Sequence, residues 1–356
     1  MKENRQHNPL VSVIINNYNY GRFLREAIES ALTQTYPYIE VIVVDDGSTD
    51  HSREVIAYYK GQIRVVLKEN GGQGSAFNAG FAISRGDIVI FLDADDVLLS
   101  NAVEEVVAVW KPEVSKVQWR LLLVTEKLEP MGQTWPMERR LPSGSVRESL
   151  LRWRYYPSPP TSGNAFSRWL LEKILPMPES EWRIAADSYL LTLAGMYGNI
   201  QSIDRELGYY RVHGRNLWHF SGWNAEELVK KLVQQVVTDI QQQNLLQEAA
   251  RSLGVPFHPI PTPLAAKTEM ALALLRPDAL IRLGLSSNRA KLALQGTYAS
   301  LVYPYMPSFL SRVRLSAWFL LTGVLPRFSA VKVALWGVVP SVRPRWLARI
   351  LQASGS

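Results

Sequence analysis

The sequence predicts an α/β fold, in which a doubly wound, mostly parallel sheet carries helices on both faces and is followed by a helical C-terminal region. Three observations support this prediction. Helical patterns separate the apolar runs along the first third of the chain, and beyond Asn224 only helical signals remain. Nearly continuous apolar runs, typical of strands buried on both faces, occur at residues 10–15, 39–44 and 87–92, and a further strand is predicted at 63–67.

Each element follows from its local pattern. The first run, LVSVII, ends in a polar turn from Asn16 to Gly21, and the other runs are followed by turns or by Gly-rich segments. Helical patterns after the turns predict helices at 22–33, 50–59, 75–84 and 101–110. From Trp119 to Pro160 the pattern weakens. Beyond it we expect strands at 162–166 and 206–212, and helices at 167–175, 181–197 and 224–253.

Composition limits the classes of protein to which this chain can belong. The chain has 356 residues, 47% of them hydrophobic and 20% charged, which is ordinary for a globular protein with a sizeable core. It has no cysteine, which excludes disulfides and thiolate metal sites. The polar start of the chain does not resemble a secretory signal. We therefore predict a cytoplasmic protein.

Charge is unevenly distributed along the chain. The net charge is +7, but no acidic residue follows Asp278, so residues 279–356 carry about +10 and the first 278 about −3. Apolar blocks alternate with Arg over residues 299–350, and each is too short to span a bilayer. This pattern favours helices lying on an anionic membrane surface, at the inner face of the membrane, over nucleic-acid binding. The alternative is a helical subdomain that packs on the rest of the chain.

Three strand ends carry polar residues. They are Asn16, Asn17 and Tyr18, then the Asp45-Asp46-Gly47-Ser48 segment, and then the cluster of Asp93, Asp95 and Asp96. Ligands of doubly wound sheets bind beyond the carboxyl ends of the strands. Like charges this close favour a cation, so the cluster predicts a Mg²⁺ or Mn²⁺ site. A solvated acidic turn that caps a helix is the structural alternative.

A Gly-rich segment, NGGQGS at 70–75, precedes a predicted helix. Its backbone amides would be able to approach a ligand closely. It follows the third strand rather than the first, so it does not fit a dinucleotide fingerprint, and no P-loop motif occurs.

Together these motifs resemble a family 2 glycosyltransferase of the GT-A fold. The matching segments are VSVIINNYN at 11–19, ALTQTYPYIEVIVVDDGSTD at 31–50, ENGGQGSAFNAGFAISRGDIVIFLDADD at 69–96 and GYYRVHGRN at 208–216. The resemblance covers about residues 9–215. It implies domains at 1–8 (a flexible N-terminus), 9–220 (the GT-A domain), 221–298 (a helical extension) and 299–356 (a basic, apolar tail).

The resemblance also implies roles for individual residues. Metal ligands would be Asp95, Asp93, Asp96 and His213, although a strand-end histidine with a backbone partner is an equal alternative for His213. Donor-binding residues would be Asn16, Asn17, Tyr18, Asp45, Gly72, Ala76, Asn78 and Asp93. The catalytic base would be Asp187, whose alternative is a helix cap. The family usually has Glu before this Asp, whereas Ala186 stands here.

The implied function is a non-processive, inverting transfer of a sugar from a nucleotide-diphosphate donor (a UDP-, GDP- or dTDP-sugar) to a hydroxyl of a saccharide or lipid-linked acceptor. Cell-surface polysaccharide or glycolipid assembly is the expected context. Spanning helices and the QxxRW motif of processive synthases are missing from the sequence. The alternatives are a catalytically inactive nucleotide-sugar-binding protein and a membrane scaffold.

Overall fold

The computed structural model describes residues 8–138, 140–214, 216, 224–339 and 342–345. Residues 1–7 of the predicted flexible N-terminus and 346–356 of the predicted tail lie outside them. The chain forms two compact units. The first, which we call the α/β unit, comprises residues 1–150 and 156–213, and the second, the helical unit, comprises 151–155 and 214–356.

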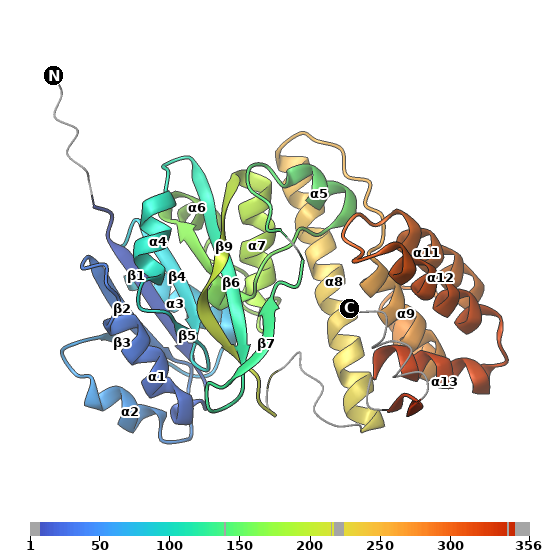
Figure 1. Ribbon diagram of the computed structural model, residues 1–356, viewed down its shortest axis with the longest axis horizontal. Helices are drawn as coiled ribbons and strands as arrows, with labels where there is room; N and C mark the ends of the chain where they lie inside the picture. The colour runs from blue at the N-terminus through green and yellow to red at the C-terminus, as the bar shows by residue number, and fades with distance from the viewer. Residues whose placement is uncertain (1–7, 139, 215, 217–223, 340–341, 346–356) are drawn as a thin grey trace. The chain divides into compact units, whose positions relative to one another are not determined.

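The α/β unit contains one sheet and its covering helices (Figure 1). Its strands are β1 (Val11–Asn17), β2 (Ile39–Asp45), β3 (Arg64–Leu67), β4 (Ile88–Asp93), β5 (Val97–Leu98), β6 (Val114–Val124), β7 (Pro130–Trp135), β8 (Asn164–Ser167) and β9 (Asn199–Arg211). Its helices are α1 (Gly21–Leu32), α2 (Ser52–Tyr58), α3 (Gln73–Ile83), α4 (Ala102–Val109), α6 (Arg168–Ile174), α7 (Ala186–Tyr197) and a 3₁₀ turn, η1 (Thr161–Gly163). Helix α5 (Arg147–Trp153) runs from the first unit into residues of the second.

The sheet is mixed, with strand order β3-β2-β1-β4-β8-β6-β9-β5, and β7 pairs with β6. Strands β1 to β4 are parallel neighbours, as the sequence predicts, whereas β8 is antiparallel to both β4 and β6. Strand β9 returns parallel to β6 and then pairs with β5. The α/β prediction is confirmed, with an antiparallel insertion in the middle of the sheet.

Register brings the predicted polar residues to one edge. Asn17 at the end of β1 is level with Asp45 at the end of β2, and Asn16 is level with Asp93 at the end of β4. Because parallel strands end at the same edge, these side chains are neighbours although they are up to 77 residues apart in the sequence.

Alternation along the strands divides the core between the two faces of the sheet. Val13, Ile15 and their neighbours on one face pack in a cluster with α1, α2 and α4. Ile14 on the other face meets α3, where an added Cβ on Gly80 would lie 2.3 Å from the Ile14 Cγ2 atom. Glycine is therefore needed there for α3 to approach the sheet.

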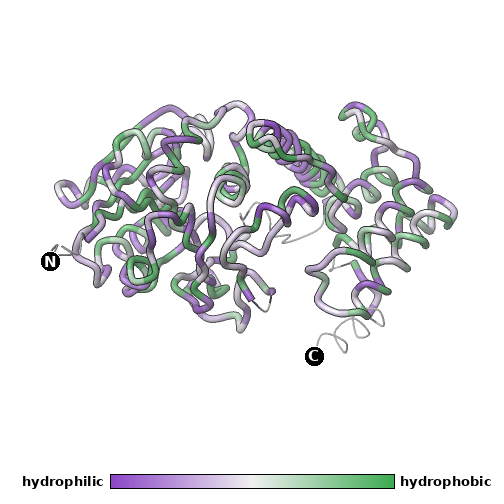
Figure 2. The backbone as a smooth tube through the Cα atoms, turned by 90° about the horizontal axis from the view of Figure 1, so that it is seen from above, coloured by the Kyte–Doolittle hydropathy of each residue, from purple (hydrophilic) through white to green (hydrophobic). Residues whose placement is uncertain are grey.

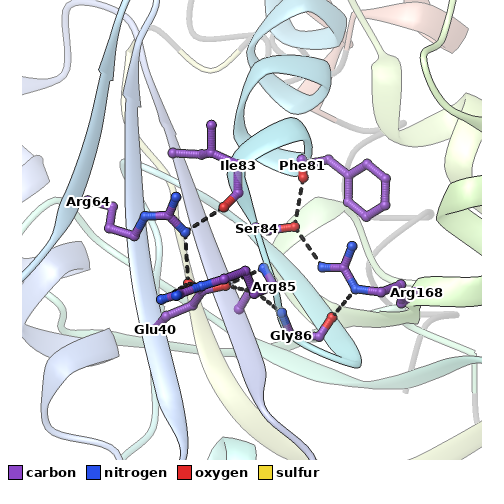
Figure 3. A network of polar contacts seen from close by, with 9 residues as sticks. Glu40, Arg64, Phe81, Ile83, Ser84, Arg85, Gly86 and Arg168 are labelled. Atoms are coloured by element: carbon purple, nitrogen blue, oxygen red, sulfur yellow. Dashed lines mark hydrogen bonds and ion pairs between the residues drawn. The ribbon is translucent and has the colours of Figure 1, made fainter.

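A polar network ties together the opposite, amino-terminal end of the strands (Figure 3). Glu40 accepts hydrogen bonds from the Ser12 hydroxyl at 2.6 Å and from Arg64 at 3.1 Å. Arg168 donates to the Gly86 carbonyl at 2.6 Å and to Ser84 at 3.0 Å. These contacts hold the turn between α3 and β4 and leave the carboxyl ends of the strands free for a site.

The helical unit has its own core. Its helices are α8 (Ala225–Ser252), α9 (Pro263–Leu275), α10 (Pro277–Arg282), α11 (Arg289–Val302), α12 (Phe309–Val324) and α13 (Arg327–Val338). Leu232, Met270 and Phe319 belong to one buried cluster contributed by α8, α9 and α12. Figure 2 shows hydrophobic stretches recurring along these helices. Among the described residues, no helix combines the length and hydropathy that crossing a bilayer requires.

Candidate active site

The acidic cluster lies where β4 ends. Asp95 approaches His213 just beyond β9, with 2.9 Å between its Oδ2 atom and the imidazole Nε2. The His213 side chain is buried and packs against the rings of Tyr20 and Phe23, whose centroids lie 5.5 and 5.2 Å away. Two predicted metal-site residues, 118 positions apart, thus meet in space.

Asp96 occupies a different place from its two neighbours. Its carboxylate is buried and accepts hydrogen bonds from the Ser162 hydroxyl at 2.6 Å and from the Arg211 backbone amide at 3.0 Å. Both oxygens therefore have protein partners. This arrangement favours a supporting role for Asp96, in which it joins β4 to β9 and to the η1 turn.

Arg211 is a residue that the sequence reasoning missed. It is buried near the end of β9, donates to the Asp95 carbonyl at 2.8 Å, and forms an ion pair with Glu26 of α1. Its guanidinium also lies 4.4 Å from the centroid of the Phe23 ring. Arg211 therefore fixes the backbone on which Asp95 is carried. The YRVH segment contains it, but a strand arginine gives no signal of this role.

Two carboxylates of the acidic cluster have pKa values above their ordinary range. Burial, and then the neighbouring Asp95 carboxylate, raise the pKa of Asp93 to about 7. Burial and the carboxylates of Asp95 and Asp93 raise the pKa of Asp96 well above its ordinary value. Shifts of this kind arise where like charges share a poorly solvated site, and a bound cation would remove them.

The end of β1 joins this cluster to the end of β2. The Asn16 side-chain amide donates to Asp93 at 2.7 Å, and that of Asn17 donates to Asp45 at 2.9 Å. Asp45 is buried and also forms an ion pair with Arg53 at 3.2 Å. The side-chain oxygens of Asn16 and Asn17 are buried and have no partner among the described residues. Buried acceptors without partners are rare in proteins and are expected where a ligand binds.

The Gly-rich loop is held by Asp46, which the sequence reasoning did not assign to the site. Its carboxylate accepts from the backbone amides of Gly71 at 2.9 Å and Gly72 at 2.7 Å, and from Lys68 at 2.8 Å. Gly72 has φ of 89°, and a Cβ there would lie 2.4 Å from the Arg183 side chain. Only glycine fits this position without strain.

The same loop is fastened to the segment that carries the predicted base. The backbone amides of Gln73 and Gly74 donate to the carbonyls of Arg183 at 2.9 Å and Trp182 at 3.2 Å. Ala185 then takes a left-handed conformation, with φ of 60°, immediately before α7 begins. Asp187 thus lies in the first turn of a helix whose start is tied to the Gly-rich loop.

Gln73 extends this connection with its side chain. Its Oε1 atom accepts from the Ala186 backbone amide at 3.0 Å, and its Nε2 atom lies 3.3 Å from Asp93 and 3.4 Å from the Thr161 hydroxyl. The backbone amide of Thr161 in turn lowers the pKa of Asp187, against the effect of burial. One side chain therefore links the Gly-rich loop, the acidic cluster and the start of α7.

Asp187 also lies in the field of a buried lysine. Burial raises the pKa of Asp187, and the ammonium of Lys116 opposes this shift. Lys116 is fully buried in β6 and donates to Ser158 at 2.7 Å and to Gln118 and Asn164 at 2.8 Å. Three acceptors satisfy its three donors, but burial lowers the pKa of Lys116 well below its ordinary value, and the Asp187 carboxylate opposes that shift.

Three predicted donor-site residues have simpler surroundings. Asn78 donates to the Met177 carbonyl at 2.9 Å and accepts from the Met177 amide at 2.9 Å, so its amide already joins α3 to the 177–179 segment. Ala76 is buried, whereas the Tyr18 side chain is 46% exposed. Of these three, Tyr18 is the most exposed.

The residues present fit a divalent cation in donor chemistry. Carboxylate oxygens and an imidazole nitrogen are ligands that Mn²⁺ accepts, and the Asp95–His213 pair with Asp93 nearby supplies them. Within the described part of the chain, no group of three such side chains is already arranged around one point.

Comparison with known proteins finds a family and a fold that this chain resembles. Residues 12–154 match the family described as glycosyl transferase family 2. The uncharacterised glycosyltransferase alr2836 of Nostoc is 40% identical over 211 residues, which cover 58% of this chain and 66% of that protein. Glycosyltransferase GlyG of Streptococcus pneumoniae is 41% identical over 99 residues, covering 27% of this chain and 33% of that protein. The matched parts are thus less than two thirds of these relatives.

A solved structure shares the fold. Staphylococcus aureus TarS in complex with UDP-GlcNAc superimposes with a TM-score of 0.51 and 16% identity over 87% of this chain and 90% of that one. The likeness confirms the predicted GT-A fold, followed by a helical region. Residues 12–154 therefore form a region that matches glycosyl transferase family 2.

Proposed function

We propose that this protein transfers a sugar from a nucleotide-diphosphate donor to a hydroxyl acceptor with inversion at the anomeric carbon. The observation that carries the proposal is the meeting of two acidic centres at one sheet edge. One is the Asp95–His213 pair with Asp93, and the other is Asp187, connected to the first through Gln73 and Thr161.

Metal binding belongs to the first centre. We assign Asp95, His213 and Asp93 as the residues that would hold Mn²⁺ or Mg²⁺, with Asp96 supporting them from behind. Bound there, the cation would supply charge neutralisation for the departing diphosphate. Asn16, Asn17 and Asp45 at the neighbouring strand ends would bind the nucleoside, since their unpartnered oxygens and buried carboxylate face the same edge.

Asp187 acts as the base in this proposal. The acceptor oxygen attacks the anomeric carbon, the bond to the diphosphate oxygen breaks, and the hydroxyl proton passes to the Asp187 carboxylate. A single displacement inverts the configuration and requires no nucleophilic enzyme carboxylate. Ala186 stands where the family usually has Glu; it is buried and its backbone amide is held by Gln73, and the proposed base, Asp187, is retained.

The test is a panel of nucleotide sugars that includes UDP-GlcNAc and GDP-mannose. Binding and donor hydrolysis are measured with Mn²⁺ and after chelation, on the full chain and on Asp95→Ala. Release of one nucleoside diphosphate that requires metal and is lost in the variant is the expected result. Donor binding with no hydrolysis or transfer to any saccharide would instead indicate a binding protein.

The acceptor and the setting are proposed from the helical unit. Its net positive charge and apolar surface support attachment to the inner face of an anionic membrane, where a saccharide or a lipid-linked acceptor in cell-surface polysaccharide or glycolipid assembly would be met. Vesicle binding by the full chain tests this part separately from donor hydrolysis.

A further inference from the structure

One helix of the helical unit turns an entirely apolar side to solvent. Each exposed residue of α12 is apolar, and we call these seven residues the apolar face of α12: Phe309, Leu310, Val313, Ala317, Leu320, Leu321 and Val324. Phe309 and Val324, at its two ends, are each 78% exposed. At 100° per residue these positions fall within about 120° of the helix circumference, so they form one continuous stripe.

The opposite side of α12 supports this orientation. Phe319 is fully buried and packs against Gly296 of α11, where an added Cβ would lie 2.2 Å from the ring. The Trp318 indole donates to the Val333 carbonyl at 2.8 Å and packs against Gly337 of α13. Trp318 is thus turned inward, and α12 is fixed by contacts on that side.

Basic residues border the apolar face. Arg314 and Arg312 occupy helix positions about 20° and 60° beyond its two edges. Arg312 reaches the carbonyl of Leu301 at 2.6 Å. Arg327 and Lys332 are exposed on α13, which follows directly. No acidic residue occurs in residues 279–356, so no carboxylate from this stretch offsets these charges.

The geometry points to the apolar face of α12 as the part of this protein that inserts into an anionic lipid surface. A helix of 16 residues is too short to span a bilayer but is suited to lie in its interface. Charge distinguishes the two candidates for covering the apolar face of α12, which are a second copy of the chain and an anionic lipid surface. A second copy would bring the same basic helices to the face and repel it, whereas anionic headgroups attract the bordering arginines. This inference rests on the membrane part of the proposed function.

The test uses the full chain and vesicles of phosphatidylcholine with or without phosphatidylglycerol. Co-sedimentation of the wild type with the anionic vesicles is compared with that of Leu320→Ser/Val324→Ser. A matched control, Ile281→Ser/Leu294→Ser, removes two exposed side chains of α10 and α11 in the same unit. We expect the α12 variant to partition at least about tenfold more weakly, because two buried aliphatic side chains are lost from the lipid. The control should bind like the wild type.

Several outcomes would overturn the inference. They are failure of the wild type to bind anionic vesicles, equal loss in the control, and binding by the α12 variant that matches the wild type. Sedimentation in solution, without vesicles, tests whether a second copy of the chain covers the apolar face of α12 instead. A wild-type dimer that the α12 variant dissociates would show that it does. Metal-dependent donor hydrolysis in the absence of vesicles is measured on every variant. It should be unchanged, so failure of lipid binding and failure of the transferase proposal give different results.

Discussion

Gln73 shows how one uncharged side chain can set the geometry of a site. Its amide oxygen is the acceptor for a buried backbone amide at the start of α7, and its nitrogen lies beside Asp93. Removing the oxygen would leave the Ala186 amide unsatisfied, which costs about 1–3 kcal/mol unless the helix start moves. Movement of this start would displace Asp187, the second residue of α7.

We therefore expect Gln73→Ala to lower kcat for transfer by about 10- to 100-fold, since a displacement of about 1 Å in a catalytic group is costly. Donor Kd, measured by titration calorimetry, should change less than about threefold. Gln62→Ala, at an exposed position of the same unit, is the control. Equal loss of donor affinity and of kcat would show that Gln73 serves donor binding instead.

The pKa of Asp187 gives a second expectation at this scale. A base must be deprotonated, and burial raises the pKa of this carboxyl above its ordinary value of 3.8. Activity should therefore fall, as the pH is lowered, at a higher pH than an unperturbed aspartate would give. Asp187→Asn should lose transfer by at least about 100-fold while donor binding persists. The measurement is the pH profile of kcat with metal saturating, and a profile flat down to pH values near 4 would contradict the assignment.

Elements differ in how far the sequence predicts them. The strands β1, β2 and β4 are mostly apolar, with Ser12 and Glu40 as interruptions, so their positions and their parallel arrangement were predictable. Strand β6 was missed because its buried face carries Lys116, Gln118 and Arg120, which look like surface residues in the sequence. Each is satisfied by partners that come from distant segments, and those partners cannot be foreseen locally.

The residues of the candidate site likewise divide into those that the sequence predicts and those that it does not. The strand-end residues Asp45, Asp93 and Asp95 were predictable, because the apolar strands fix which edge they reach. Thr161 and Ser162 were missed, because they meet the acidic cluster only after the antiparallel β8 has been inserted beside β4. Residues that support a site through tertiary contacts leave no periodic signal in the sequence.

Asp46 allows a prediction for an element as a whole, the Gly-rich loop. In Asp46→Ala the amides of Gly71 and Gly72 and the Lys68 ammonium lose their common acceptor. We expect the free energy of unfolding to fall by about 1–3 kcal/mol and donor KM to rise at least about fivefold, as the loop loses its fixed shape. Denaturant unfolding and donor titration measure the two effects. Asp204→Ala, a half-exposed carboxylate paired with Arg120 in the same sheet, is the control and should leave donor KM unchanged.

At the scale of the whole molecule, the chain has two cores and an uneven charge. The apolar cluster of the sheet and that of the helices share no residue. Folding units with separate cores unfold with their own transitions when few interactions couple them. The difference in charge between residues 279–356 and the rest of the chain has a separate consequence. The basic residues lie on helices that do not contain the residues proposed for catalysis.

A matched pair of glycines tests whether the two cores are independent. An added Cβ would lie 2.3 Å from Ile14 for Gly80 in the α/β unit, and 2.2 Å from the Phe319 ring for Gly296 in the helical unit. Overpacking costs about 1–3 kcal/mol, which exceeds the gain of up to about 1 kcal/mol from replacing glycine by alanine in a helix. Both alanine variants should therefore be destabilised.

Calorimetry of the full chain should then show two transitions. Gly80→Ala should lower one and Gly296→Ala the other, each by about 2–4 °C per kcal/mol. The transition lowered by Gly80→Ala should also be the one that rises when the donor and Mn²⁺ are added, because only the state that binds the ligand is stabilised by it. A single transition lowered equally by both variants would show instead that the two units unfold as one cooperative body. In that case a substitution in the helical unit would affect the active site only by changing the stability of the whole chain.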